Sequence, residues 1–187
     1  MRANSRPVHS KRVVKLAIER MAGEIAPRIA DKNPVVLAVM HGGAFTALEL
    51  CKHFDFPHEF DYCHVTRYHG DTAGGQLEWR VRPSPSLHGR TVLIVDDILD
   101  RGHTLRALRA ELIEIGVAAH LTAVLVVKRL FGVAERPGAD FIGLPVDDVY
   151  VFGCGMDYRG YWRELRSIYA VKRAKKAKPA KSQKRAK

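Results

Sequence analysis

Three aspartates follow a short apolar run near the middle of the chain. Asp96 and Asp97 come directly after the apolar residues 92–95, and Asp100 comes after two further apolar residues. The sequence RGHT at positions 101–104 then leads into a helical pattern. Carboxylates accept hydrogen bonds from hydroxyl groups and attract Mg²⁺, whereas a glycine turn before a helix offers backbone N–H groups to a phosphate. The combination indicates a phosphorylated sugar as the ligand.

The elements that position these residues follow from the pattern of apolar residues. The run 92–95 predicts a buried parallel strand with its acids at the carboxyl end, where ligands bind in open α/β sheets. A second unit of this kind runs from an apolar strand at 35–40 through His41, Gly42 and Gly43 into a helix that ends near Lys52. Two strand–turn–helix units predict a parallel sheet with crossover helices. Both turns should therefore face one crevice.

The rest of the chain adds helices and strands around these two units. Residues 9–30 have the spacing of an amphipathic helix capped by Ser10, and a helix that includes Leu105 should stop at Gly116. We expect strands at 59–68, 76–81, 121–127 and 149–153, and a loop with a short apolar piece at 137–145. The glycine-rich residues 69–75 predict a simple hairpin, with a lid over the site as the rarer alternative. Beyond the recurring strand–turn–helix unit, the sequence indicates no internal repeat and no separate second domain.

Composition limits the class of protein. A chain of 187 residues with 47% apolar and 27% charged residues is typical of one globular domain. Cys51, Cys63 and Cys154 are odd in number and far apart, which argues against a disulfide framework or a zinc site and favours the cytoplasm. The start of the chain lacks the apolar core of a secretory signal, and no apolar run is long enough to span a membrane.

The positive charge is concentrated at the end of the chain. The formal net charge is +11, but residues 171–187 contain nine Lys or Arg and no acid, so the rest of the chain carries only +2. This composition predicts a disordered tail, and the alternative is a weak, salt-sensitive attraction to nucleic acid or other polyanions. The tail contains no aromatic residue on which a base could stack.

The stretch VLIVDDILDRGHT, residues 92–104, resembles the phosphoribosyl pyrophosphate signature of the type I phosphoribosyltransferases. The resemblance implies an α/β fold with a mainly parallel central sheet flanked by helices, a small hood and a mobile β-loop, in a single domain of residues 1–170. Residues 35–165 are similar to the purine branch, the hypoxanthine-guanine phosphoribosyltransferases. The supporting segments are LVVKR at 125–129, YVFG at 150–153, MDY at 156–158 and YWREL at 161–165.

The resemblance implies roles on the phosphoribosyl side of the site. Asp96 and Asp97 would bind the ribose hydroxyls near a magnesium ion, and Asp100 would act as acid or base at the purine N7. The 5-phosphate would lie in the loop formed by Asp100, Arg101, Gly102, His103 and Thr104. The pyrophosphate loop would consist of Met40, His41, Gly42 and Gly43, with a cis peptide bond between Met40 and His41.

Further roles follow for the purine side and for the lid. Lys128 would donate to the purine O6, Tyr150 would stack on the ring, and the Val151 backbone would bind the base edge. Asp157 would lie by a second magnesium ion, and Arg163 would bind pyrophosphate. Arg67 and Tyr68 would begin the mobile loop that closes over the reaction. Arg67, Arg101 and His103 replace the residues that are common in the family at their positions, and six other histidines, His64 among them, are interpreted as structural or surface residues.

The implied activity is purine salvage. Hypoxanthine or guanine plus 5-phosphoribosyl 1-pyrophosphate would give IMP or GMP and pyrophosphate, with Mg²⁺ as cofactor. Relatives form homodimers or homotetramers, so we expect an oligomer. Two alternatives remain open: a pyrimidine phosphoribosyltransferase with the same fold, and a non-catalytic regulator that binds RNA through the basic tail. The segments around Lys128 and Tyr150 favour the purine, and the full set of acids with Arg163 favours the enzyme.

Overall fold

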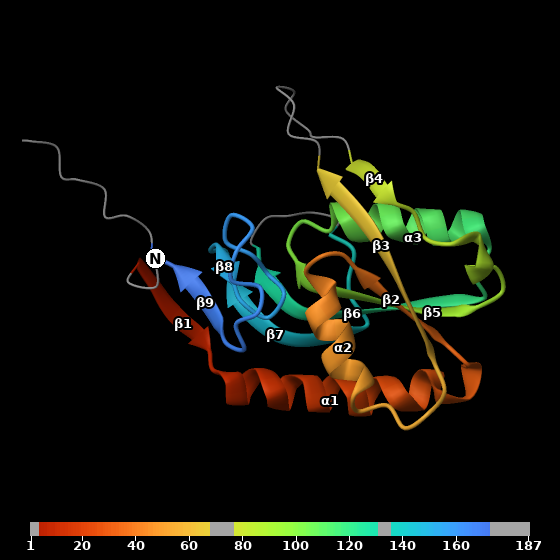
Figure 1. The fold of residues 1–187 in the computed structure, drawn as a ribbon, viewed down its shortest axis with the longest axis horizontal. Helices are drawn as coiled ribbons and strands as arrows, with labels where there is room; N and C mark the ends of the chain where they lie inside the picture. The colour runs from red at the N-terminus through yellow and green to blue at the C-terminus, as the bar shows by residue number, and fades with distance from the viewer. Residues whose placement is uncertain (1–3, 68–76, 131–135, 173–187) are drawn as a thin grey trace, which may run out of the picture.

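The computed structural model describes residues 4–67, 77–130 and 136–172. Its centre is a six-stranded sheet in the order β4-β3-β2-β5-β6-β7 (Figure 1). The strands are β2 (Val35–Val39), β3 (Glu59–Arg67), β4 (Leu77–Val81), β5 (Thr91–Leu99), β6 (Ala119–Arg129) and β7 (Phe141–Asp147). All neighbours pair in parallel except β4, which pairs with β3 in antiparallel fashion. The strand that carries the aspartates, β5, is therefore central, between β2 and β6.

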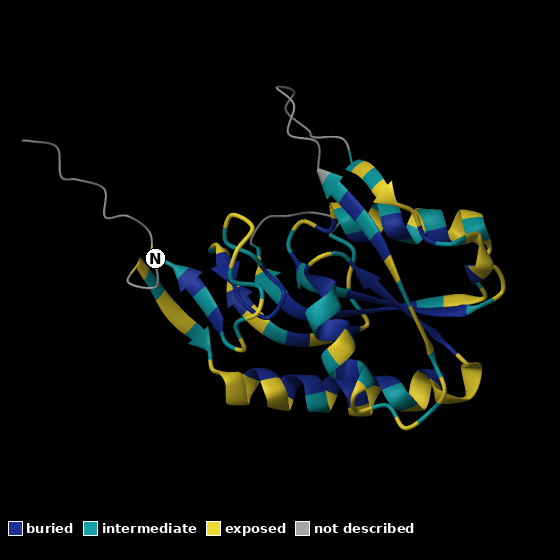
Figure 2. Ribbon diagram, in the orientation of Figure 1, coloured by how far each residue is buried: buried dark blue, intermediate teal, exposed yellow. Residues whose placement is uncertain are grey.

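Helices cover both faces of this sheet. Helices α1 (Lys11–Ile29) and α2 (Gly43–Cys51) pack on one face, and α3 (His103–Ile115) packs on the other with the short 3-10 helix η3 (Pro85–Leu87) (Figure 1). A second 3-10 helix, η2 (Ala30–Lys32), follows α1. Because each face has its own apolar core, the four residues 92–95 of β5 are fully buried (Figure 2).

The helix ends agree with the sequence prediction. Ser10 caps α1, and its hydroxyl accepts a hydrogen bond from the Val13 backbone N–H at 3.4 Å. Gly116 ends α3 in the left-handed conformation with φ 81°, which a residue with a side chain rarely adopts. None of the helices in the described part of the chain is long and apolar enough to cross a membrane.

A small antiparallel sheet forms the hood beside the main sheet. It has the order β1-β9-β8 and consists of β1 (Ser5–His9), β9 (Ile168–Val171) and β8 (Val151–Phe152). Val171 pairs with Ser5, and the Lys172 N–H donates to the Asn4 carbonyl at 2.8 Å. The first two residues of the predicted tail are therefore part of the hood, and residues 173–187 lie outside the described residues.

Three sequence predictions need correction. Strand β5 does not end before the acids but continues to Leu99, so Asp96 and Asp97 lie within it. The predicted loop at 137–145 contains most of β7, whose residues alternate between buried and exposed; its Pro145 is tolerated because β7 is an edge strand. The predicted strand at 149–153 is only the two-residue β8, because the chain turns at Gly153 with φ 95°.

Candidate active site

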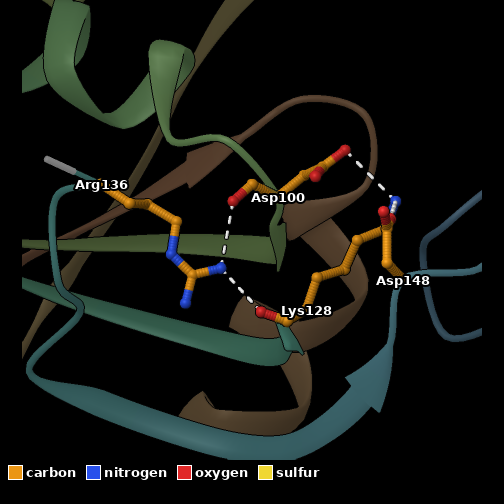
Figure 3. A network of polar contacts seen from close by, with 4 residues as sticks. All are labelled: Asp100, Lys128, Arg136 and Asp148. Atoms are coloured by element: carbon orange, nitrogen blue, oxygen red, sulfur yellow. Dashed lines mark hydrogen bonds and ion pairs between the residues drawn. The ribbon is translucent and has the colours of Figure 1, made fainter. Parts of the chain in front are cut away.

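The ends of β5 and β6 bring together an acid and a base far apart in the sequence. Leu99 pairs with Val127, so the next residues, Asp100 and Lys128, are neighbours. The Lys128 ammonium lies 3.3 Å from the Asp100 carboxylate and 3.3 Å from that of Asp148 (Figure 3). The Lys128 side chain is only 14% exposed. Of its two partners, the Asp100 side chain is 40% exposed and that of Asp148 is 62% exposed. Asp100 is therefore the more shielded of the two partners.

An arginine fixes the backbone under this pair. The Arg136 guanidinium donates to the carbonyl of Asp100 at 3.2 Å and to that of Lys128 at 2.7 Å (Figure 3). The sequence prediction missed both Arg136 and Asp148. Asp148 directly follows β7, and a parallel strand there would have placed it at the same edge of the sheet as Lys128.

The loop after Asp100 forms a small pocket at the start of α3. Gly102 has φ 77°, and a Cβ at this position would lie 2.6 Å from the Pro137 ring. The pocket has a volume of about 50 Å³ and is lined by Asp96 and by residues 98–105 with Val124, which include Arg101, Gly102, His103 and Thr104. Arg101 and His103 are exposed at its rim. A helix N-terminus beside basic side chains suits a phosphate group.

The two acids within β5 are half-buried. The Asp96 carboxylate accepts a hydrogen bond from the Asp97 N–H at 2.8 Å. Burial raises the pKa of Asp96 well above its ordinary range, and the neighbouring Asp97 carboxylate raises it further. Burial also raises the pKa of Asp97, although the positive charge of Arg163 opposes this effect. Two acids held in this way favour a ligand that brings hydroxyl donors or a cation.

The loop after β2 packs against these acids. The peptide bond between Met40 and His41 is cis, in agreement with what the family resemblance implied, and the Met40 N–H donates to the Cys63 carbonyl at 2.8 Å. Gly42 and Gly43 are buried, and a Cβ on either would overlap β5: the Asp97 carboxylate for Gly42 and the Val95 carbonyl for Gly43. Only glycine permits this close approach of loop and strand.

The segment after β8 closes the site from the hood side. Arg163 donates to the Gly155 carbonyl at 2.7 Å and to the Asp157 carboxylate at 2.8 Å. The second Asp157 carboxylate oxygen accepts from the Gly160 N–H at 2.7 Å. Gly155 lies so close to the Gly42 carbonyl that a Cβ there would overlap it. Arg163 and Asp157 therefore lie next to the loop after β2.

A wider cavity of about 310 Å³ opens beside Lys128. Its lining includes Asp148, Val149 and Tyr150, together with the hood residues Val171 and Lys172. The Tyr150 ring is half exposed, and its hydroxyl donates to the Asp157 carbonyl at 3.0 Å. Val151 is buried in β8. An aromatic face beside an ammonium group suits a flat ring that carries a carbonyl oxygen.

One histidine interpreted from the sequence as structural or surface lies at this site. The His64 ring makes an edge-to-face contact with that of His41, with ring centroids 4.5 Å apart. Burial and the nearby charges of His41, Arg80 and Arg163 lower the pKa of His64. No sequence motif marks His64. Cys63 pairs with Val39 at the end of β2, so His64 lies beside the loop after β2, and this strand pairing would have been the signal.

Two predicted site residues cannot be placed fully. Arg67 ends β3, and its backbone pairs with Leu77, but its side chain is not described. Tyr68 lies outside the described residues, as does the loop at 69–75. The other predicted site residues meet at the carboxyl ends of β2, β5 and β6 and at the adjoining hood.

Comparison with known proteins identifies the family. The model of the phosphoribosyl transferase domain family matches residues 8–159. The chain belongs to this family. This phosphoribosyltransferase is 30% identical over 167 residues to the hypoxanthine-guanine-xanthine phosphoribosyltransferase of Tritrichomonas foetus, covering 89% of this chain and 91% of that protein. It is 32% identical over 157 residues to the hypoxanthine-guanine phosphoribosyltransferase of Streptococcus pneumoniae, covering 83% and 87%.

A solved structure agrees with this assignment. The fold is similar, with a TM-score of 0.79 and 26% identity, to a mutant hypoxanthine phosphoribosyltransferase from Trypanosoma cruzi complexed with the product IMP. The match covers 89% of this chain and 90% of that one. The α/β phosphoribosyltransferase fold expected from the sequence, with its mainly parallel sheet and small hood, is confirmed.

Proposed function

We propose that the protein transfers the 5-phosphoribosyl group of phosphoribosyl pyrophosphate to N9 of hypoxanthine or guanine, giving IMP or GMP and pyrophosphate. The observation that carries this proposal is the pair formed by Asp100 and Lys128. Asp100 lines the small pocket at the start of α3, called below the phosphate-sized pocket, and Lys128 lines the wider cavity beside Tyr150. The pair therefore stands where a sugar phosphate and a base would meet. The names of the relatives support a 6-oxopurine as that base.

The chain supplies groups for each part of the reaction. The bond between ribose C1 and the pyrophosphate oxygen breaks as the bond to N9 forms, so positive charge develops on the ribose and negative charge on the leaving group. Arg163 and the backbone N–H groups around Gly42 would stabilise the departing anion. In the tautomer that carries its proton on N7, the purine has a free lone pair on N9, and Asp100 would accept the N7 proton as the bond from N9 to ribose C1 forms. Lys128 would donate to O6, and Tyr150 would stack on the ring.

The acids also fit the Mg²⁺ that this chemistry uses. No three acids, histidines or cysteines in the described part of the chain form a cluster that would hold a metal by themselves. Mg²⁺ is usually held by one or two carboxylates with substrate phosphates and water, so Asp96, Asp97 and Asp157 suffice. When bound, the ion would neutralise charge on the pyrophosphate group. Removal of Mg²⁺ with a chelator should therefore stop turnover.

The protein should act as an enzyme whether or not the basic tail is present. Deletion of 173–187 should leave the rate of pyrophosphate release from phosphoribosyl pyrophosphate and hypoxanthine within about twofold, because the proposed contacts all lie before residue 172. A protein that releases no pyrophosphate but loses RNA affinity on this deletion would be a regulator and not the proposed enzyme. Light scattering of the full chain tests the expected homodimer or homotetramer in the same preparation.

A further inference from the structure

A second large cavity lies outside the site described above. Its volume is about 320 Å³, within the range of small-molecule sites, and it opens between α1, α2 and the chain after Arg163. It is lined by Lys11, Val14, Lys15, Ile18, Phe45, Glu49, Lys52, His53 and Arg166. Helices α1 and α2 pack against each other here (Figure 1). No residue of the candidate active site lines this cavity.

The rim of the cavity is positively charged. Two of its lysines have acidic partners: Lys52 pairs with Glu49, and Lys15 lies 3.4 Å from Glu19 on the same helix. Lys11 and Arg166, in contrast, have no ion-pair partner among the described residues. These two exposed cations come from different segments and border one hollow. A multiply charged anion would complement them, whereas the basic tail of the chain would be repelled.

The floor of the cavity is apolar. Val14 and Ile18 are each 3% exposed, and Phe45 is half-buried beside them. The Phe45 ring contacts no other aromatic ring in the part of the chain that the structure describes. An apolar floor with a half-buried aromatic ring suits a flat base, and a cationic rim suits phosphates. A free sugar or an apolar ligand would use only one of these features.

We propose that this cavity binds a nucleoside polyphosphate, with the base against Phe45 and the phosphates between Lys11 and Arg166. The cavity is separate from the phosphoribosyl site, but two of the segments that line the cavity continue into segments of the phosphoribosyl site. Helix α2 carries Phe45 and starts at the loop that packs on Asp97, and Arg166 follows Arg163 by three residues. A ligand in the cavity would therefore contact α2 and the chain around Arg166 on the side away from the phosphoribosyl site.

The test is calorimetric titration of ATP into the full chain in the presence of saturating IMP, which fills the proposed active site. We expect one ATP per chain. The double variant Lys11→Glu/Arg166→Glu should bind ATP at least tenfold more weakly, because it reverses two charges at the rim. The matched control is Arg6→Glu/Lys32→Glu, which changes the net charge equally at exposed positions away from the cavity and should retain the parent affinity within about twofold.

The role of the base is tested with Phe45→Leu, which keeps an apolar side chain. This variant should bind ATP at least about fivefold more weakly, since stacking on an aromatic ring is lost, and should bind tripolyphosphate as the parent does. The proposal is overturned if no ATP binds in the presence of IMP, or if the control loses as much affinity as the cavity variant. Equal binding of ATP and tripolyphosphate by the parent would overturn the nucleoside part of it.

Discussion

Lys128 offers the sharpest single test of how the site recognises its base. Replacement by methionine, which has nearly the same length and no charge, removes the proposed donor to the purine O6. The fold should survive, because the partner carboxylates of Asp100 and Asp148 are 40% and 62% exposed and can be solvated when the ammonium group is gone. The effect should therefore appear in catalysis with the purine and not in the protein yield.

The magnitude follows from the kind of bond that is lost. A hydrogen bond from a charged, shielded donor contributes about 1.5–3 kcal/mol, and each 1.4 kcal/mol corresponds to about a factor of ten. Lys128→Met should therefore lower kcat/KM for hypoxanthine by about 10- to 150-fold. The KM for phosphoribosyl pyrophosphate should change little, since Lys128 lines the cavity beside Tyr150 and does not line the phosphate-sized pocket.

The assay is steady-state formation of IMP, with one substrate varied while the other is saturating. The control is Asp148→Asn, which removes the charge of the more exposed carboxylate beside Lys128. It should lower kcat/KM for hypoxanthine by less than about fivefold, because exposed ion pairs contribute roughly 0–1 kcal/mol. Equal losses for hypoxanthine and for phosphoribosyl pyrophosphate in Lys128→Met would refute the proposed role in base recognition. A loss in the control as large as that in Lys128→Met would show that the ion pairs, and not the bond to O6, matter.

Three further changes test other parts of the site. Asp100→Asn should lower kcat by about 10²- to 10⁴-fold with an unchanged fold, the usual cost of losing a general acid or base; a near-normal kcat would remove Asp100 from the proton transfer. Gly42→Ala should lower kcat/KM by about 10²-fold because its Cβ displaces the Asp97 carboxylate, whereas Gly138→Ala, where a Cβ meets nothing within 4 Å, should be neutral in the same assay. Asp96→Asn should raise the free energy of unfolding of the ligand-free protein at pH 7 by about 1 kcal/mol or more, measured by urea denaturation.

The pH dependence of this last effect has a definite sign. Because burial raises the folded-state pKa of Asp96, its ionisation destabilises the folded protein as the pH rises from the unfolded value of about 3.9 through the folded value. Asparagine cannot ionise, so the gain in stability should be present at pH 7 and should vanish below about pH 4. A gain that persists unchanged at low pH would mean that a cause other than charge burial stabilises the variant.

The sequence sufficed for the parts of the molecule with strong local patterns. The fully apolar run before Asp96 and the glycine turn after Met40 marked two strands of a parallel sheet, and the comparisons bear out the fold. The hood strands β1 and β9 were missed because they have five and four residues, too few to show periodicity. Strand β7 was missed because Pro145 reads as a breaker when the strand order is unknown.

The contacts at the site that the sequence did not predict have the same origin. Asp148 and Arg136 reach Lys128 and Asp100 only because β7 and the chain before it return to the ends of β5 and β6, and no local pattern records that return. The contact of His64, interpreted as a structural or surface residue, with His41 was not foreseen because the two residues lie 23 positions apart in the sequence. Long-range contacts of this kind depend on strand order and register, which one sequence does not display.

The most direct test of the proposed function measures nucleotide formation with a panel of bases. The full chain is incubated with phosphoribosyl pyrophosphate and Mg²⁺, and with hypoxanthine, guanine, xanthine, adenine or uracil in turn. We expect nucleotide and pyrophosphate to form in equal amounts with hypoxanthine, guanine or both, and adenine and uracil to react at least about 10²-fold more slowly, because neither matches a donor placed for the purine O6. Efficient reaction with uracil or adenine and none with hypoxanthine or guanine would contradict the proposed function.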